Sequence, residues 1–272
     1  MSEHTFHTPD AIELHVELGS GSLTTRAGST DATRVEITGP RADEFEVEQR
    51  GRTVTVIAPK QRLGNGRDQH AVVVDLPTGS DLTGRIGSAD TTATGSYHAV
   101  RLKTGSGDVE IEATTGATAI DTGSGDVRCE RVGDDLRLKS GSGDIELGEV
   151  LGSLGVSTGS GDVVLGRAAG AAVLKTGSGD LQVRLMEADL QLTTASGDLQ
   201  VRHASRGRLT AKTASGDVLV GVGEGTPVWT DISTVTGSVS SNLPPTGRPA
   251  EGQDHVEVRI TSVSGDVRLQ RG

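Results

Sequence analysis

Apolar and polar residues alternate over short stretches of this chain, and one stretch-turn-stretch pattern returns every 18 residues through its middle. Each repeat holds an alternating stretch, a Gly/Ser-rich turn that ends in Gly-Asp, and a second alternating stretch. Alternation with a period of two is typical of a β-strand with one buried face. A fixed period this short indicates stacked structural coils. The aspartates that close the turns are Asp90, Asp108, Asp126, Asp144, Asp162, Asp180, Asp198 and, one residue late, Asp217.

Aligning the repeats gives four columns of mostly aliphatic residues, which begin at Val100, Leu102, Val109 and Ile111. The columns predict at least two short strands per coil, each stacked on the equivalent strand of the next coil at about 4.8 Å. One coil alone is unstable, because four buried aliphatic side chains contribute roughly 6–12 kcal/mol and ordering the coil costs more than that. Neighbouring coils must supply the remainder, as in other solenoids.

Small hydroxyl side chains form a further column just before the turn, and by parity they face inward. We interpret them as structural, because a hydroxyl row is inert without a base beside it. Cys129 stands in one of the aliphatic columns and is expected to behave as a small buried hydrophobe. The hydroxyl column comprises Thr104, Thr122, Ser140, Thr158, Thr176, Thr194 and Thr213.

Both ends of the chain depart from the period. Residues 1–85 predict an N-terminal cap of strands, in which the turn at Gly19–Ser22 resembles an opening coil. Residues 86–240 hold the repeat coils, and residues 241–272 predict a loop over Leu243–Gly252 followed by a closing coil. These ends are expected to hide the sheet edges and to keep the protein monomeric. The strands predicted for the cap are Ile12–Leu18, Arg34–Thr38, Glu44–Gln49, Thr53–Ala58 and Ala71–Leu76, with a loop around Pro59–Asp68.

No linker divides the chain, so the sequence predicts one β-solenoid domain over residues 1–272. The column offsets do not fit the six-residue period of left-handed hexapeptide helices. They also do not fit calcium β-rolls, which carry two G-G-x-G-x-D motifs per coil. The predicted fold is therefore all-β: a single-stranded parallel β-helix, right-handed, with 18-residue coils and an N-terminal β-strand cap.

Composition excludes several classes of partner. The chain has two Phe, one Tyr and one Trp, and its net charge is −11. These features argue against nucleic-acid binding, which uses basic patches and aromatic platforms, and against docking on an anionic membrane. A single cysteine excludes an intrachain disulfide. No signal peptide and no apolar run long enough for membrane insertion is visible, so we expect a cytoplasmic location.

The row of turn aspartates is the one feature that resembles a site. Its structural interpretation is that each carboxylate accepts backbone N–H bonds within its own turn. Its functional interpretation is a calcium row, although calcium needs six to eight oxygen ligands and one carboxylate per coil supplies few. We expect no metal and no cofactor. The residues of the alternative calcium row are Asp108, Asp126, Asp144, Asp162, Asp180 and Asp198.

Other candidate residues favour no chemistry. Gly155–Gly159 matches the G-x-S-x-G string of a nucleophile elbow, but it lies in the middle of a coil with no helix after it. The histidines His4, His7, His15 and His203 lack metal-ligand spacing and are expected at the surface. We therefore predict no catalytic residue.

Outward positions of the later coils suggest a binding surface instead. Val164, Val173 and Leu219 are expected to face outward there, where charged residues become fewer. The alternative is that scattered exposed apolar residues are simply normal for a protein surface.

The T-G-S-G-D-[VIL] coils resemble the bacterial β-strand-repeat family labelled "putative adhesin", also called the toastrack domain, of the actinobacterial type. The opening motif at Phe6–Gly19, the V-x-L-P-x-G-S motif at Val74–Ser80 and the closing motif at Val256–Asp266 carry the same resemblance. It covers essentially the whole chain. The resemblance implies a single-stranded parallel β-helix, and it brings no established catalytic residues.

From these observations we expect a non-enzymatic rigid scaffold or protein-interaction module with an unidentified protein partner. The resemblance links such modules to envelope-stress and regulatory systems. Two alternatives stay open: a surface adhesin, and a carbohydrate-active β-helix enzyme. The enzyme would need paired carboxylates and aromatic sugar platforms, for which Trp229 is the one candidate.

Overall fold

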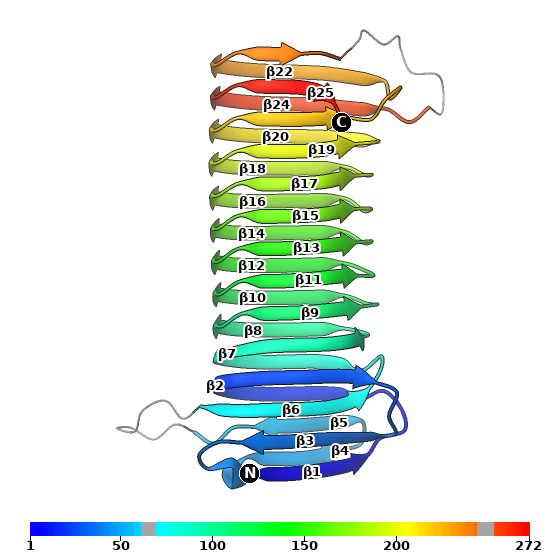
Figure 1. Ribbon diagram of the computed structural model, residues 1–272, viewed down its shortest axis with the longest axis vertical. Coiled ribbons are helices and arrows are strands. Elements are labelled where there is room, and N and C mark those ends of the chain that lie inside the picture. The colour runs from blue at the N-terminus through cyan, green and yellow to red at the C-terminus, as the bar shows by residue number, and fades with distance from the viewer. Residues whose placement is uncertain (61–68, 244–252) are drawn as a thin grey trace. The chain divides into compact units, whose positions relative to one another are not determined.

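The computed structural model describes residues 1–60, 69–243 and 253–272, which form β-strands almost throughout (Figure 1). Contacts within the chain define two compact units: unit 1 is Met1–Asp134 with Leu138–Ser140, and unit 2 is Asp135–Arg137 with Gly141–Gly272. Each unit contains a stack of parallel strand pairs offset by one coil, which confirms the predicted parallel β-helix with 18-residue coils. The right-handed winding of the β-helix and the single domain over residues 1–272 remain predictions.

The coils of unit 1 are built from strands that pair in parallel with the equivalent strand of the next coil. β8 pairs with β10, and Val100 lies beside Thr118. β9 pairs with β11, and Val109 lies beside Val127. The two halves of the long strand β7 pair with β8 and β9. These strands are β7 (Asp81–Tyr97), β8 (Val100–Ser106), β9 (Val109–Thr114), β10 (Thr118–Ser124) and β11 (Val127–Val132).

The coils begin earlier in the chain than the 18-residue repeat suggests. β2 (Glu13–Gly28) pairs in parallel with β7 along its length, from Glu13 beside Asp81 to Ala27 beside Gly95, which confirms the opening coil at Gly19–Ser22. On its other side β2 pairs with β5 (Thr53–Ile57) and β6 (His70–Pro77), which together complete one more coil. The expected boundary at residue 85 therefore falls inside β7.

An antiparallel group of strands closes the start of unit 1 (Figure 1). β4 (Glu46–Arg50) pairs antiparallel with β5, while β3 (Ala32–Thr38) pairs antiparallel with both β6 and β1 (Ser2–His7). The short 3-10 helix η1 (Ala42–Glu44) precedes β4. The predicted N-terminal cap is thus confirmed as a change from parallel to antiparallel pairing. The loop expected around Pro59–Asp68 lies mostly outside the described residues.

Unit 2 continues with the same design. β14, β16, β18 and β20 pair in parallel in that order, and β13, β15, β17, β19 and β21 form the second series. The residues of β12 (Leu136–Ser142) are divided between the two units. The strands are β13 (Ile145–Val150), β14 (Leu154–Ser160), β15 (Val163–Ala168), β16 (Ala172–Ser178), β17 (Leu181–Met186), β18 (Leu190–Ser196), β19 (Leu199–Ala204), β20 (Gly207–Ser215) and β21 (Val218–Val222).

The last two coils of unit 2 are stacked out of chain order. β24 (Val256–Ser264) lies between β20 and β22 (Val228–Thr236) and pairs in parallel with both (Figure 1). β25 (Val267–Arg271) likewise pairs with β21 and with β23 (Val239–Ser241). The segment predicted as the closing coil is therefore an internal coil, and β22 with β23 forms the end coil. The loop expected over Leu243–Gly252 lies mostly outside the described residues.

The inward residues of the two coils explain this order. β24 turns Val256, Val258 and Ile260 inward, and each is at most 1% exposed, because coils cover it on both sides. The register places Thr230 of β22 beside Val258, and that threonine is exposed. A hydroxyl tolerates water better than an aliphatic side chain does, so the more polar coil occupies the end.

The predicted core columns are confirmed. All positions in the four columns that begin at Val100, Leu102, Val109 and Ile111 are buried through to Leu190, Leu192, Leu199 and Val201. The hydroxyl column is buried as well, apart from Ser140, which is half-buried.

One further buried column escaped the sequence analysis. As far as Ala204 it lies three residues after the Ile111 column instead of two, so strict alternation misses it, and several of its members are small or polar. Its residues are Thr114, Val132, Val150, Ala168, Met186, Ala204 and Val222.

Candidate functional site

The Gly-Asp turn requires glycine for two reasons. Gly161 adopts a φ of +115°, which L side chains rarely adopt. A Cβ atom on Gly161 would also lie 2.1 Å from the carbonyl oxygen of Gly143 in the neighbouring coil. Glycine therefore lets successive turns stack in direct contact, and this contact places each aspartate beside the backbone of the next turn.

The aspartate row joins neighbouring coils. In unit 1, Asp90 Oδ1 accepts a hydrogen bond from the N–H of Asp108 at 3.0 Å, and Asp108 Oδ1 accepts one from Asp126 at 2.9 Å. In unit 2, Asp144 Oδ1 accepts from Asp162 at 2.9 Å, and the pattern continues through Asp180 and Asp198. The expectation that each carboxylate bonds its own turn is wrong, because parallel stacking brings the next turn's amide within reach of the side chain.

The row follows the spatial order of the coils and ends with a serine. Asp198 Oδ1 accepts from the N–H of Asp217, Asp217 from Asp266 at 2.7 Å, and Asp266 from Ser238 at 2.9 Å. Hydrogen bonds from the Ser238 backbone and hydroxyl hold the pKa of the Asp266 carboxyl below its ordinary value. Within the described residues, Ser238 has no further coil to bond, so an aspartate there would lack the amide that the others have.

Three further aspartates bond the next coil in the same way from another corner of their own coils, and sequence reasoning missed them. Asp81 Oδ1 accepts from the N–H of Ala99 at 3.0 Å, Asp135 Oδ1 from Ser153 at 2.8 Å, and Asp189 Oδ1 from Arg208 at 2.9 Å. The hydroxyl and the backbone N–H of Ser153 lower the pKa of the Asp135 carboxyl. The signal in the sequence that could have revealed these aspartates is their recurrence at every third coil.

The alternative interpretation of the aspartates as a calcium row can be compared with their surroundings. Over residues 1–60, 69–243 and 253–272, no group of three or more His, Cys, Asp and Glu side chains is arranged to hold a metal ion. Five carboxylates of the row use Oδ1 to accept an amide N–H of the next coil: Asp108, Asp144, Asp162, Asp180 and Asp198. One carboxylate per coil does not supply the six to eight oxygens that calcium prefers.

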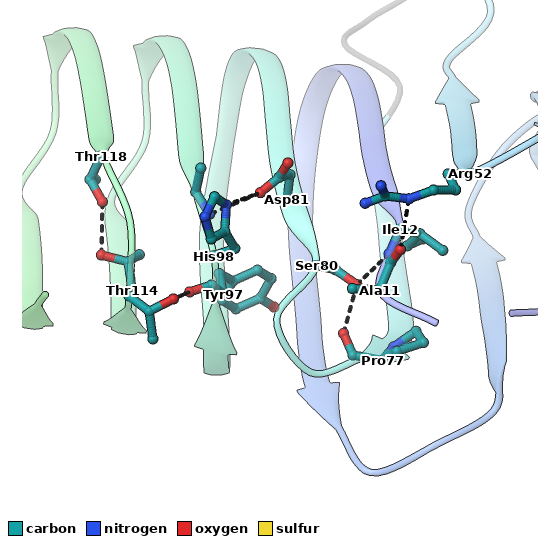
Figure 2. Close-up of polar contacts among 12 residues, drawn as sticks. Ala11, Ile12, Arg52, Pro77, Ser80, Asp81, Tyr97, His98, Thr114 and Thr118 are labelled. Atoms are coloured by element: carbon teal, nitrogen blue, oxygen red, sulfur yellow. Dashed lines mark hydrogen bonds and ion pairs between the residues drawn. The ribbon is translucent and has the colours of Figure 1, made fainter. Parts of the chain in front are cut away.

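The polar contacts of unit 1 do not assemble a nucleophile (Figure 2). His98 Nδ1 lies 3.0 Å from Asp81 Oδ1, and Ser80 is adjacent in sequence. However, the buried Ser80 hydroxyl donates to the carbonyl oxygen of Pro77 at 2.7 Å and accepts from the N–H of Ile12 at 2.9 Å. Through these two bonds the Ser80 hydroxyl links the turn before β7 to the first residues of the opening coil.

The other sequence candidates lie apart from one another. Ser157 of the G-x-S-x-G string is exposed on β14, in extended backbone with no helix after it. His15 Nε2 lies 3.4 Å from Glu17 Oε1, a half-buried contact between neighbouring outward positions of one strand. Trp229 is exposed on the end coil, where it packs against Arg259.

Two buried groups of unit 1 are held in their neutral forms. Burial raises the pKa of the Cys129 thiol to about 12, and the side chain is 1% exposed, as expected for a small core residue. Burial also raises the pKa of Tyr97 to about 12, although its hydroxyl lies 2.6 Å from Thr25 Oγ1. Neither group is placed to react with a ligand at the surface.

A groove of about 290 Å³ lies over the later coils of unit 2. Outward residues of neighbouring strands form its floor, where Gln182 lies beside Gln200, Gln200 beside Leu219, and Leu219 beside Arg268. The aspartate row forms its acidic side. The residues that line the groove are Asp180, Gln182, Asp198, Leu199, Gln200, Asp217, Val218, Leu219, Asp266 and Arg268.

The groove corresponds in part to the binding surface expected from the sequence. Val164 and Leu219 belong to the same outward row, because Val164 lies beside Gln182. Val173 lies on β16, beside Gln191 of the other strand series, so it does not share that row. All three side chains are half-buried.

Comparison with protein families gives a match over nearly the whole chain. The model of the Toastrack DUF4097 family matches residues 10–270. The chain belongs to the Toastrack DUF4097 family. This confirms the resemblance drawn from the Gly-Asp coils, while the actinobacterial type remains a prediction. A search of curated proteins found no match.

Solved structures similar to this Toastrack chain come from bacteria and are distant. A "putative adhesin" from Bacteroides fragilis is 14% identical, with a TM-score of 0.40, over 98% of this chain and 96% of that one. A "putative adhesin" from Parabacteroides distasonis is 12% identical, with a TM-score of 0.44, over 98% and 97%. A "Putative lipid binding protein" from the same species is 12% identical, with a TM-score of 0.34, over 98% and 96%. The family assignment rests on the family model and not on these likenesses.

The described residues contain no helix with the length and apolar character needed to span a membrane.

Proposed function

We propose that this Toastrack chain is a non-enzymatic rigid scaffold that binds a protein partner through the acidic groove of unit 2. The groove carries the proposal, because it combines an outward amide and aliphatic floor with a line of four carboxylates at its side. Arg268 is the one cation among its lining residues. Clustered charge of one sign steers a partner of the opposite sign, so the partner presents Lys or Arg side chains.

The bonds between coils support a rigid role. The four aspartates that line the groove are each fixed by the amide of the next coil, at 2.7 to 2.9 Å. On another side of the same unit, Arg167 forms ion pairs with Glu149 and Glu187 of the coils on either side. A surface whose side chains are already ordered loses less conformational entropy on binding.

The proposal is tested by introducing two positive charges into the groove floor. Gln200 and Leu219 are neighbours there, and the double variant Gln200→Lys/Leu219→Lys weakens the local attraction for a basic partner. The matched control is Gln191→Lys/Thr210→Lys, which changes two neighbouring half-buried outward residues of the same coils on the other strand series. Both variants should retain the wild-type melting curve.

Affinity capture from cytosol, followed by quantitative mass spectrometry and a binding titration, gives the readout. A specific protein should bind the wild type and the control, more weakly at high salt, and should be lost with the groove variant. Equal binding of that protein by the groove variant would move the interface elsewhere. If no protein binds above background, or if the chain turns over a carbohydrate substrate, the scaffold proposal fails.

A cytoplasmic location, as expected from the sequence, is part of the same proposal. Fractionation of producing cells against surface markers tests it. Recovery of the intact chain on the cell surface would favour the adhesin alternative.

A further inference from the structure

In the described part of the chain, no further strand pairs with the outer edge of the end coil. Among the described residues, β22 pairs with β24 alone and β23 with β25 alone. Natural edge strands are usually blunted by charged residues, proline or bulges. β22 reads Val-Trp-Thr-Asp-Ile-Ser-Thr-Val-Thr, so it is rich in β-branched residues and carries Asp231 as its single charge.

Exposed apolar surface concentrates at this same place. Six large apolar side chains are exposed within the described residues, and four of them lie on β22, β23 and β24. Trp229 is 52% exposed, Val235 74%, Val239 49% and Val263 52%. Such concentrations mark interaction sites more often than isolated exposed residues do. None of these four side chains lines the groove of the proposed function.

The edge strands at the start of unit 1, β4 and β1, carry more charged and polar residues than β22 does. β4 carries Glu46, Glu48 and Arg50, and Arg50 forms an ion pair with Glu48 at 2.7 Å. β1 carries Glu3 and two histidines. A head-to-tail contact would set the apolar edge of β22 against one of these polar edges. The end coil therefore fits a second end coil better than it fits the start of another copy.

From this edge we propose that two copies of this chain associate through β22, antiparallel, about a two-fold axis at Ile232. In this register Trp229 lies opposite Val235 of the other copy, Thr230 opposite Thr234, and Asp231 opposite Ser233. Residues directly opposite in an antiparallel pair share a face. The pairing is self-complementary, as a two-fold interface demands.

Each of these pairs satisfies a group that the single chain leaves exposed or unbonded. Trp229 is held over Arg259, with the guanidinium carbon 5.6 Å from the ring centroid, and Val235 of the other copy would cover its free side. The buried hydroxyl of Thr234 lacks a hydrogen-bond partner within the described part of the chain, and Thr230 of the other copy would supply one. Asp231 would meet a hydroxyl and not a second carboxylate.

The test is a charge exchange across the two-fold axis, read as molecular mass by analytical ultracentrifugation of the full chain over a wide concentration range. The wild type should show a monomer–dimer equilibrium that stops at the dimer. Ser233→Asp places two carboxylates opposite each other twice per dimer, and should weaken association about tenfold or more. The double variant Asp231→Lys/Ser233→Asp places opposite charges there and should restore it.

Ser157→Asp, at an exposed outward position of β14, is the matched control and should behave as the wild type. Circular dichroism checks that each variant is folded. The proposal is overturned if the wild type stays monomeric at every concentration, if its mass grows beyond a dimer, or if Ser233→Asp associates as well as the wild type. It is also overturned if the double variant fails to regain the dimer.

Discussion

At the scale of single residues, this protein uses side chains to join one coil to the next. Asp162 shows the arrangement: its Oδ1 accepts the N–H of Asp180 at 2.8 Å, while its own N–H donates to Asp144. Like charges stacked at coil spacing repel by about 1 kcal/mol per pair in water-like surroundings. A hydrogen bond from an amide to a charged group contributes about 1.5–3 kcal/mol, which exceeds that repulsion.

The acceptor oxygen, and not the charge, is expected to be what Asp162 contributes. Asp162→Asn keeps an oxygen within reach of the Asp180 amide and removes like-charge repulsion, so its free energy of unfolding should stay close to that of the wild type. Asp162→Ala removes the acceptor and should cost about 1 kcal/mol. Urea unfolding of the two variants measures the difference. Equal losses would mean that the bond to the next coil is unimportant.

Cys129 makes unit 1 sensitive to alkali. The thiol has a pKa of 9.0 when unfolded and about 12 in the fold, so between these values the folded state holds a proton that the unfolded state has lost. The stabilisation is complete below pH 9 and is lost as the pH rises toward 12. At a pH about 1.5 units above 9, the free energy of unfolding should have fallen by about 2 kcal/mol.

The control for this prediction is Cys129→Val, which places in the column a residue found there in other coils, such as Val183. Its alkaline loss should begin only near pH 10, where Tyr97 contributes in the same direction. Urea titrations of both proteins at several pH values measure how the free energy of unfolding falls with pH. A pH dependence identical to that of the wild type would show that the thiol is ionised or exposed in the fold.

At the scale of strands, alternation separates residues that hold the coil together from those that do not. Leu174 on β16 is fully buried, and the next residue, Lys175, is exposed. Inward residues lose contacts with two neighbouring coils when they are shortened, whereas outward residues lose little.

A matched pair of substitutions on β16 tests this division. Leu174→Ala should lower the free energy of unfolding by about 2–5 kcal/mol, since it removes buried methyl groups and leaves a cavity. Lys175→Ala should change it by less than about 0.5 kcal/mol. Thermal melting of both variants is sufficient, and superimposable curves would refute the assignment of the inward face.

Inward and outward positions could be predicted from the sequence where strict alternation applied, and could not where the strand departs from it. The columns from Val100 to Val201 follow strict alternation, so inward and outward residues were separable. The Met186 column is offset by three residues instead of two, because the alternation of the strand is interrupted there, and it was missed. The hydrogen-bond donor to each aspartate was expected in the same turn but lies in the next coil. The 18-residue period gives the spacing of the coils and does not give the direction in which a side chain points.

At the scale of the molecule, the order of coils could not be read from the chain. Residues 207–222, 228–241 and 256–271 all carry the coil pattern, and any of them could stack on any other. The inward Thr230 and the serine in place of aspartate at Ser238 were the signals that residues 228–241 occupy the end. The groove was only partly foreseen, since its floor requires the register of β17, β19, β21 and β25.

The aspartate row gives a prediction for the whole protein. Adding millimolar calcium, or a chelator, should leave the midpoint of thermal unfolding unchanged. A ligand present at 100 times its dissociation constant stabilises the folded state by about 2.7 kcal/mol per site, so several occupied sites would be obvious. A large rise in the midpoint with calcium, reversed by chelator, would reinstate the calcium row.

The exchanged order of the last coils has a consequence for how the protein reaches its final state. If the coils form in sequence order, β22 meets the open edge of β20 before β24 is in place, and parallel pairing is available to both strands. The provisional strand must then leave so that Val256, Val258 and Ile260 can enter. The chain has one tryptophan, Trp229, and it lies on the displaced strand. Its fluorescence should therefore reach the native value later than circular dichroism does during refolding, whereas coincident traces would mean that β24 arrives first.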